Sequence, residues 1–146
     1  MKISEHFSLE EFEHSNTAAK HGIHNKIETQ LQFDSITELC DMVLEPLRKH
    51  LGRSITISSG YRSEALNKHV GGSWTSQHRC VGNDAACDIV FDGMKENFQW
   101  IVDYLPFTQA IYEVSGNRVW IHIGYNRNHL KQKALTFNNG KYGNFK

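Results

Sequence analysis

One short stretch of the chain, SQHRCVGNDAACDIVF (residues 76–91), gathers several side chains that bind metal ions. It contains the imidazole, thiol and carboxylate groups that zinc prefers, at His78, Cys80, Asp84, Cys87 and Asp88. A catalytic zinc takes three protein ligands and leaves a position open for water, whereas a structural zinc is enclosed by four. The stretch is therefore compatible with either a hydrolytic centre or a structural zinc centre.

Three further residues outside this stretch have side chains suited to hydrolytic chemistry. Arg62 follows an apolar strand in SSGYRS, and Glu113 and His122 lie in IYEV and WIHI. Each one taken alone is an ordinary capping or surface residue. Together they would supply a cation for an oxyanion, a general base and a last zinc ligand. The combination favours a catalytic zinc.

The segment that carries Glu113 and His122 has the pattern of a β-hairpin. If its loop is the two-residue Gly116–Asn117, then Glu113 pairs with Trp120 and lies diagonal to His122, about 7–8 Å away between backbones. That separation leaves room for a zinc ion and a water. A three-residue loop would place Glu113 and His122 on opposite faces of the strands, so the hypothesis depends on the turn.

A structural zinc site is the main alternative that uses the same residues. Its four ligands would be His78, Cys80, Cys87 and His122. This spacing matches no common zinc-finger pattern, and it leaves Arg62 and Glu113 without a role. We therefore favour the enzyme.

The elements that must position these residues follow from periodicity and turn signals. Helices are expected over about residues 9–14, 31–51, 64–70 and 94–105, and strands over about 55–57, 86–91, 109–114, 118–125 and 134–137. Residues 17–26 and 71–84 are expected to be irregular, and Pro46 should kink the long helix or loosen its last turn. The expected class is α+β, with a small, mainly antiparallel sheet and helices packed on one side.

Length, charge and cysteine count limit the function classes. The 146 residues are expected to form one domain, 1–146, which is monomeric. The 16 basic and 16 acidic side chains balance, which argues against nucleic-acid or membrane partners. No secretory signal or membrane span is visible, so we expect synthesis in the cytoplasm. The odd set of three cysteines predicts no disulfide framework, and Cys40 is expected to be a buried, reduced thiol on a helix.

The segments LEEF, SSGYRSEALNKHVGGSWTSQH, ACDI, IYE and WIH together resemble the zinc D-Ala-D-Ala carboxypeptidase family, closest to its small phage endolysin peptidases. The resemblance extends to about Tyr125. It implies a Hedgehog/DD-peptidase fold, one Zn²⁺ per chain, and hydrolysis of an amide bond in the peptide stem of peptidoglycan by a zinc-bound water. The sequence does not identify the bond, so D-Ala-D-Ala carboxypeptidase, L-Ala-D-Glu endopeptidase and crosslink cleavage all stay open. A phage- or prophage-encoded protein that acts on the cell wall is the expected context.

The resemblance also assigns roles to individual residues. The implied zinc ligands are His78, Asp88 and His122. Glu113 is the implied general base and Arg62 stabilises the oxyanion or anchors a substrate carboxylate. Ser76 and Tyr61 are the other implied substrate-binding residues. A non-catalytic cell-wall-binding or structural domain of the same fold is the alternative function.

Two departures from the family pattern affect these assignments. Some relatives have a histidine where this chain has Trp120, which is why the base is sought at Glu113. The family also usually places fewer residues before its aspartate than the nine that separate His78 from Asp88. We predict Asp88 as the ligand, because it opens a strand whereas Asp84 lies in a turn. Residues 80–84 would then bulge outwards.

Overall fold

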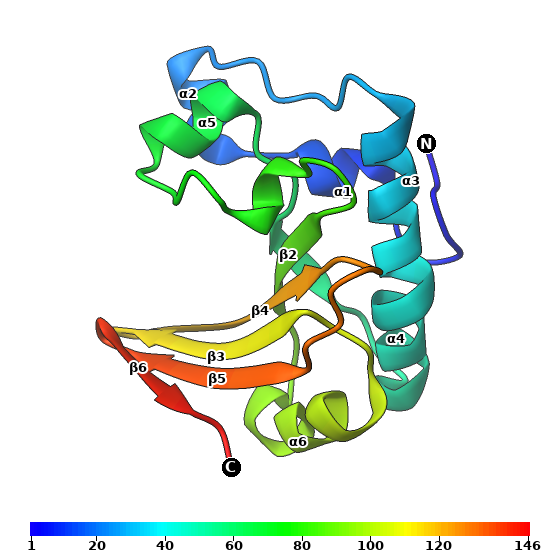
Figure 1. Ribbon diagram of the computed structural model, residues 1–146, viewed down its shortest axis with the longest axis vertical. Helices are drawn as coiled ribbons and strands as arrows, with labels where there is room; N and C mark the ends of the chain where they lie inside the picture. Colours follow the sequence, from blue (N-terminus) through cyan, green and yellow to red (C-terminus); the bar gives the residue numbers. More distant parts are fainter.

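A six-stranded sheet organises the molecule, and its strands lie in the order β1–β2–β4–β3–β5–β6 (Figure 1). The computed structural model describes residues 1–146. The strands are β1 (Thr56–Ser59), β2 (Ala85–Val90), β3 (Gln109–Ser115), β4 (Arg118–Tyr125), β5 (Lys133–Asn138) and β6 (Lys141–Asn144). All neighbouring strands are antiparallel except β3 and β5, which run parallel. The prediction of an α+β fold with a mainly antiparallel sheet is confirmed.

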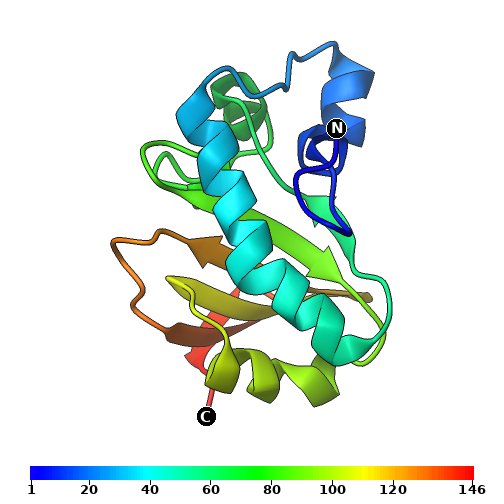
Figure 2. The same ribbon diagram turned by 90° about the vertical axis from the view of Figure 1, so that its right-hand side faces the viewer.

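The longest helices pack on one face of this sheet. The helical elements are α1 (Leu9–Glu13), α2 (Asn16–His21), α3 (Gln30–Leu39), the π-helical turn η1 (Cys40–Leu44), α4 (Glu45–Leu51), α5 (Glu64–His69), the 3-10 turn η2 (Gln77–Arg79) and α6 (Met94–Tyr104). Figure 2 shows α3 and α4 crossing the sheet diagonally, with α6 beneath them. The shorter α1, α2 and α5 gather above β2 in Figure 1. No helix is both long enough and apolar enough to span a membrane.

The hydrophobic core lies between the sheet and the long helices. It contains 24 buried residues, most of them from α3 to α4, from α6 and from alternate positions of the strands, with the rest from α1 and from connecting segments. On β4, Ile121 and Ile123 face this core, whereas Trp120 and His122 face the other side. Burying one such aliphatic side chain contributes about 1.5–3 kcal/mol. The helix-covered face therefore stabilises the sheet and leaves its opposite face for polar side chains.

The predicted disturbance at Pro46 is present, but it lies before the proline. The Glu45 N–H donates to the carbonyl of Cys40, five residues back, so the helix widens into a π turn. Proline has no N–H and its ring crowds the preceding turn, and an inserted residue relieves that clash. The last turn is regular and ends at Gly52, which has a φ of +67°.

Three elements were not predicted, and one of them is the short 3-10 turn η2 within residues 71–84. Helix α2 lies in a segment expected to be irregular, where the Ser15 side chain caps it and Gly22 ends it. It buries only Ala18, so no apolar stripe marks it in the sequence. Strand β6 pairs with β5 although all its residues are exposed, and it therefore has no apolar alternation either.

Candidate metal centre

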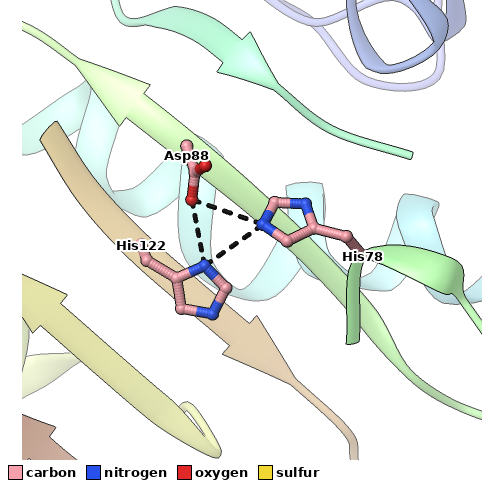
Figure 3. Close-up of side chains that lie close together, drawn as sticks. All are labelled: His78, Asp88 and His122. Carbon is pink, nitrogen blue, oxygen red and sulfur yellow. Dashed lines mark hydrogen bonds and ion pairs between the residues drawn. The ribbon is translucent and has the colours of Figure 1, made fainter. Parts of the chain in front are cut away.

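His78, Asp88 and His122 converge on one point on the open face of the sheet (Figure 3). Asp88 and His122 are direct partners across β2 and β4, and His78 reaches them from η2. The Nε2 atom of His78 lies 3.2 Å from Nδ1 of His122 and 3.3 Å from Oδ1 of Asp88. The third edge, from His122 Nδ1 to Asp88 Oδ1, is 2.9 Å. Ligand atoms about 2.0–2.1 Å from a tetrahedral zinc stand roughly 3.3 Å apart, so the triangle has the size that zinc requires.

The protonation of His78 also fits a bound cation. Its Nδ1 lies 2.7 Å from the carbonyl oxygen of Gly60, and only an N–H can donate to that oxygen. In the neutral ring, Nε2 then carries a lone pair that faces the carboxylate oxygen of Asp88. Two acceptors at this distance repel each other unless a cation or a proton lies between them. A zinc ion supplies that charge, and the carbonyl holds the ring in the metal-binding tautomer.

The environment holds the ligands in their metal-binding forms. Burial lowers the pKa of His78 and so favours the neutral imidazole, although the charge of Asp88 acts in the opposite direction. Burial alone would raise the pKa of Asp88, but the neighbouring His78 and His122 hold it well below its usual value. Zinc binds neutral imidazole and ionised carboxylate, so neither His78 nor Asp88 needs to lose a proton at neutral pH.

Asp84 has a different set of partners. Its Oδ1 accepts hydrogen bonds from Gln77 Nε2 at 3.1 Å and from Asn126 Nδ2 at 2.9 Å. It therefore braces the loop that follows η2, and it does not belong to the cluster around His122. Val81, in the same loop, is 56% exposed, as expected for an outward bulge.

The cysteines lie in the hydrophobic core and not at this site. The core includes all three free thiols, those of Cys40, Cys80 and Cys87. The prediction that Cys80 bulges outwards is wrong, since its side chain turns inwards from a left-handed backbone with a φ of +53°. A thiol packs as a small apolar group, and burial raises the pKa of Cys80 to about 12. The closed site with two cysteines and two histidines is therefore not formed, and the prediction of a buried, unpaired Cys40 is confirmed.

The β3–β4 hairpin has the two-residue loop that is needed to place Glu113 on the same face as His122. Ser115 pairs with Arg118 across the two-residue Gly116–Asn117, and Glu113 pairs with Trp120. Glu113 and His122 consequently lie on the same face, and both line a cavity of about 370 Å³. Burial raises the pKa of Glu113, and so does the charge of Asp88. Smaller effects of His122, Trp120 and Arg62 act in the opposite direction.

Arg62 lines this cavity from the segment that follows β1. Its backbone N–H donates to the carbonyl of His78 at 2.8 Å, and its Nη1 donates to Asn67 Oδ1 at 3.2 Å. The guanidinium makes no ion pair with a carboxylate. Burial lowers the pKa of Arg62, against the opposing effects of Asp88 and Glu113. Donors of this guanidinium therefore stay free for a ligand.

A model of the peptidase M15 family matches residues 5–124, which include the three converging side chains, Glu113 and Arg62. The chain belongs to the peptidase M15 family. The family is zinc-dependent, so the resemblance to zinc carboxypeptidases is confirmed, and a zinc ion fits the three converging side chains. No curated protein matched the sequence. Strands β5 and β6 of this M15 peptidase lie outside the matched region.

Ser76 and Tyr61, the two remaining predicted site residues, differ in their accessibility to a substrate. Ser76 lines the cavity, and its Oγ accepts a hydrogen bond from the N–H of His78 at 3.2 Å. Tyr61 is only 4% exposed and packs in the core, with an edge on a neighbouring cavity. Direct contact of Tyr61 with a substrate is therefore limited to that edge.

The sequence analysis missed three residues that contribute to the site: Gly60 through its backbone, Gly124 through its small size and Tyr142 as a lining side chain. The Gly60 carbonyl orients His78, and the only signal for it was its place in SSGYRS. Gly124 lies under the side chain of Gln77, and a Cβ there would come within 2 Å of Gln77 Oε1. Tyr142, on the unpredicted β6, lines the cavity beside Glu113 and had no signal at all.

Proposed function

We propose that this M15 peptidase hydrolyses an amide bond in the peptide stem of peptidoglycan, with one zinc ion held by His78, Asp88 and His122. The observation that carries the proposal is the convergence of these three side chains in a cavity that also contains Glu113 and Arg62. Family membership supports a metallopeptidase that acts on peptidoglycan. The bond is of the D-Ala-D-Ala carboxypeptidase or the L-Ala-D-Glu endopeptidase type, and the place of action is the cell wall.

In the proposed reaction, Glu113 accepts one proton from the attacking water and later returns it to the leaving amine. Bound zinc lowers the pKa of a water and polarises the scissile carbonyl. Glu113 accepts the proton of the attacking water while the water oxygen bonds to the carbonyl carbon. The proton then passes to the amide nitrogen as the C–N bond breaks, which leaves a carboxylic acid and an amine. The acid's proton moves to the amine at neutral pH, so the final products are a carboxylate and an ammonium group. The raised pKa of Glu113 makes its carboxylate a stronger base for the first of these proton transfers, from the water.

Arg62 has the complementary task of binding negative charge. Its guanidinium donates N–H groups either to the oxygen that becomes negative during attack or to a carboxylate of the stem peptide. The hydrogen bond from its backbone to the carbonyl of His78 ties its position to that of a zinc ligand. Cation and metal centre are thereby held in one rigid unit.

The test is digestion of purified peptidoglycan, followed by identification of the products by mass. Glu113→Gln is nearly isosteric but cannot accept a proton, so we expect it to keep its zinc and to lose activity by roughly 10²–10⁴-fold. Glu96→Gln, at an exposed position of α6, is the matched control and should be fully active. Turnover by Glu113→Gln close to that of the wild type would rule out Glu113 as the base. Binding of sacculi by the wild type without any product would favour the non-catalytic wall-binding alternative.

A further inference from the structure

A second cavity, of about 590 Å³, adjoins the one that contains Glu113. Arg62, Asp88 and Trp120 line both cavities, so the two form a single cleft whose arms meet beside the candidate metal centre. We call the cavity with Glu113 the Glu113 arm. The second cavity, between α2 and the start of β4, is the Arg118 arm, after the residue at its far wall.

The two arms differ in charge. The Glu113 arm contains the carboxylate of Glu113 in addition to the metal-ligand cluster. The only carboxylate of the Arg118 arm is Asp88, and it is already paired with both histidines. The cationic side chains of that arm are Arg62 and Arg118, with His14 beside them. The Arg118 arm is therefore an electropositive pocket.

Neither guanidinium of this arm forms an ion pair within the protein. Arg118 forms no ion pair and lies over the ring of Trp120, with its guanidinium carbon 5.6 Å from the ring centroid. Arg62 donates its side-chain hydrogen bond to the neutral amide oxygen of Asn67. Arg62 is partly buried, and withdrawing its charge from water costs free energy that an anionic ligand would recover, whereas the exposed Arg118 offers a cation that such a ligand can reach from solvent.

We propose that the Arg118 arm binds a carboxylate of the substrate and that Arg118 selects for it. The proposal rests on the proposed function, since it takes a peptide to lie across the cleft. A planar guanidinium matches a carboxylate through two parallel N–H bonds, and a neighbouring aromatic ring holds the fork in place. Two sources of this group exist in a stem peptide, which are its C-terminal carboxylate and the carboxylate of an acidic residue within the chain.

The test compares three synthetic stem peptides: one with both carboxylates free, one amidated at the internal acidic residue and one amidated at the C-terminus. Their affinities are measured by calorimetry for zinc-loaded Glu113→Gln, which is not expected to cleave them, and for Glu113→Gln/Arg118→Gln. We expect the second variant to bind the free peptide about tenfold more weakly. For the peptide that lacks the recognised carboxylate, the two variants should bind equally. A C-terminal source supports carboxypeptidase cleavage, and an internal source supports cleavage within the peptide.

Matched variants separate a charge effect from general damage. Glu113→Gln/Arg48→Gln removes an arginine on α4, outside the cleft, and should bind all three peptides like Glu113→Gln. Glu113→Gln/Arg118→Lys keeps the charge but loses the fork, so it should recover part of the affinity. The proposal is overturned if Glu113→Gln and Glu113→Gln/Arg118→Gln bind the free peptide equally. It is also overturned if the second variant binds both amidated peptides more weakly than the first does. If wild-type protein cleaves no peptide, the proposed function fails, while the binding measurements still decide the role of Arg118.

Discussion

Asp84 lies in the turn before β2 and Asp88 lies within β2, and the two carboxylates have different partners. Asp88 contacts His78 and His122, whereas Asp84 accepts hydrogen bonds from two side-chain amides. An amide donor satisfies a carboxylate oxygen without bringing a second metal ligand near it. The chemistry open to each aspartate therefore follows from the groups that its strand or turn brings to it.

Asp88→Ala is expected to lose stoichiometric zinc, because it removes the oxygen ligand from the triangle. Asp84→Ala is the control with the same chemical change, and it should retain its zinc while the loop after η2 loosens. Metal analysis of both purified variants, together with activity, makes the comparison. Full zinc in Asp88→Ala, with zinc lost in Asp84→Ala, would reverse the assignment.

The pH dependence of the reaction is expected to report Glu113. Burial raises the pKa of this carboxyl above its ordinary value of 4.5, and only its ionised form accepts a proton. Activity should therefore be present above the raised pKa and fall as the pH decreases through it, so the acid limb of kcat/KM should have its midpoint above 4.5. A pH profile of the zinc-loaded enzyme measures this midpoint. An acid limb that is unchanged in Glu113→Gln would exclude Glu113 as the titrating base.

At the scale of elements, two strand pairings and one loop clamp assemble the site. The β2–β4 pairing sets Asp88 opposite His122, and the β3–β4 hairpin sets Glu113 opposite Trp120. The clamp joins η2 to the segment after β1 through the bonds from His78 to Gly60 and from Arg62 to His78. Rigid strands thus carry two ligands, and two hydrogen bonds hold the third against them.

Gly60→Ala is expected to disturb this clamp. A Cβ at Gly60 would lie 2.7 Å from the Cα and the carbonyl oxygen of Phe12, and that oxygen is held by a hydrogen bond from Tyr61. The backbone must shift, so we expect a loss of about 1–3 kcal/mol in unfolding free energy and weaker zinc binding as His78 moves with it. Denaturant titration and zinc competition measure the two effects.

Gly22→Ala is the control for that substitution. A Cβ at Gly22 meets nothing within 4 Å, although its φ of +65° makes the change cost about 1–2 kcal/mol. It should lower stability and leave zinc affinity unchanged. Equal zinc affinity in Gly60→Ala and the wild type would show that the clamp does not position His78.

At the scale of the whole molecule, the core and the metal centre occupy opposite faces of one sheet. The 24 core residues lie between the sheet and the long helices, and none of the three metal-binding side chains is among them. The three cysteines also lie in this core and are free. The apolar core is therefore built without the candidate metal ligands, so we expect the protein to fold without zinc.

Removal of zinc is accordingly expected to inactivate the protein without unfolding it. A ligand at a thousandfold excess over its Kd stabilises the folded state by about 4 kcal/mol, so chelation should lower the Tm by roughly 10 °C. Circular dichroism before and after chelation, with a zinc add-back control, measures this change. An unfolded apoprotein would instead indicate a structural zinc.

The features that the sequence alone determined are those encoded by near neighbours in the chain. Apolar residues three and four apart define α3 to α4 and α6, and the Gly116–Asn117 pair marks a hairpin turn, although only the strand pairing shows that its loop has two residues and that Glu113 shares a face with His122. The residue types of SGYRS, SQH and WIH were enough to indicate zinc hydrolysis. Periodicity and turn geometry act over a few residues, so they are legible without a structure.

Only the tertiary structure decided which of these residues meet and what lies between them. It turned Cys80 into the core, brought Asp88 and not Asp84 to the histidines, and set the Gly60 carbonyl against His78. It also joined two cavities into a cleft, in which Arg62 lines both arms and Arg118 lines one. These relations depend on strand pairing and packing between segments far apart in the chain, for which the spacing of residues along the sequence carries no direct signal.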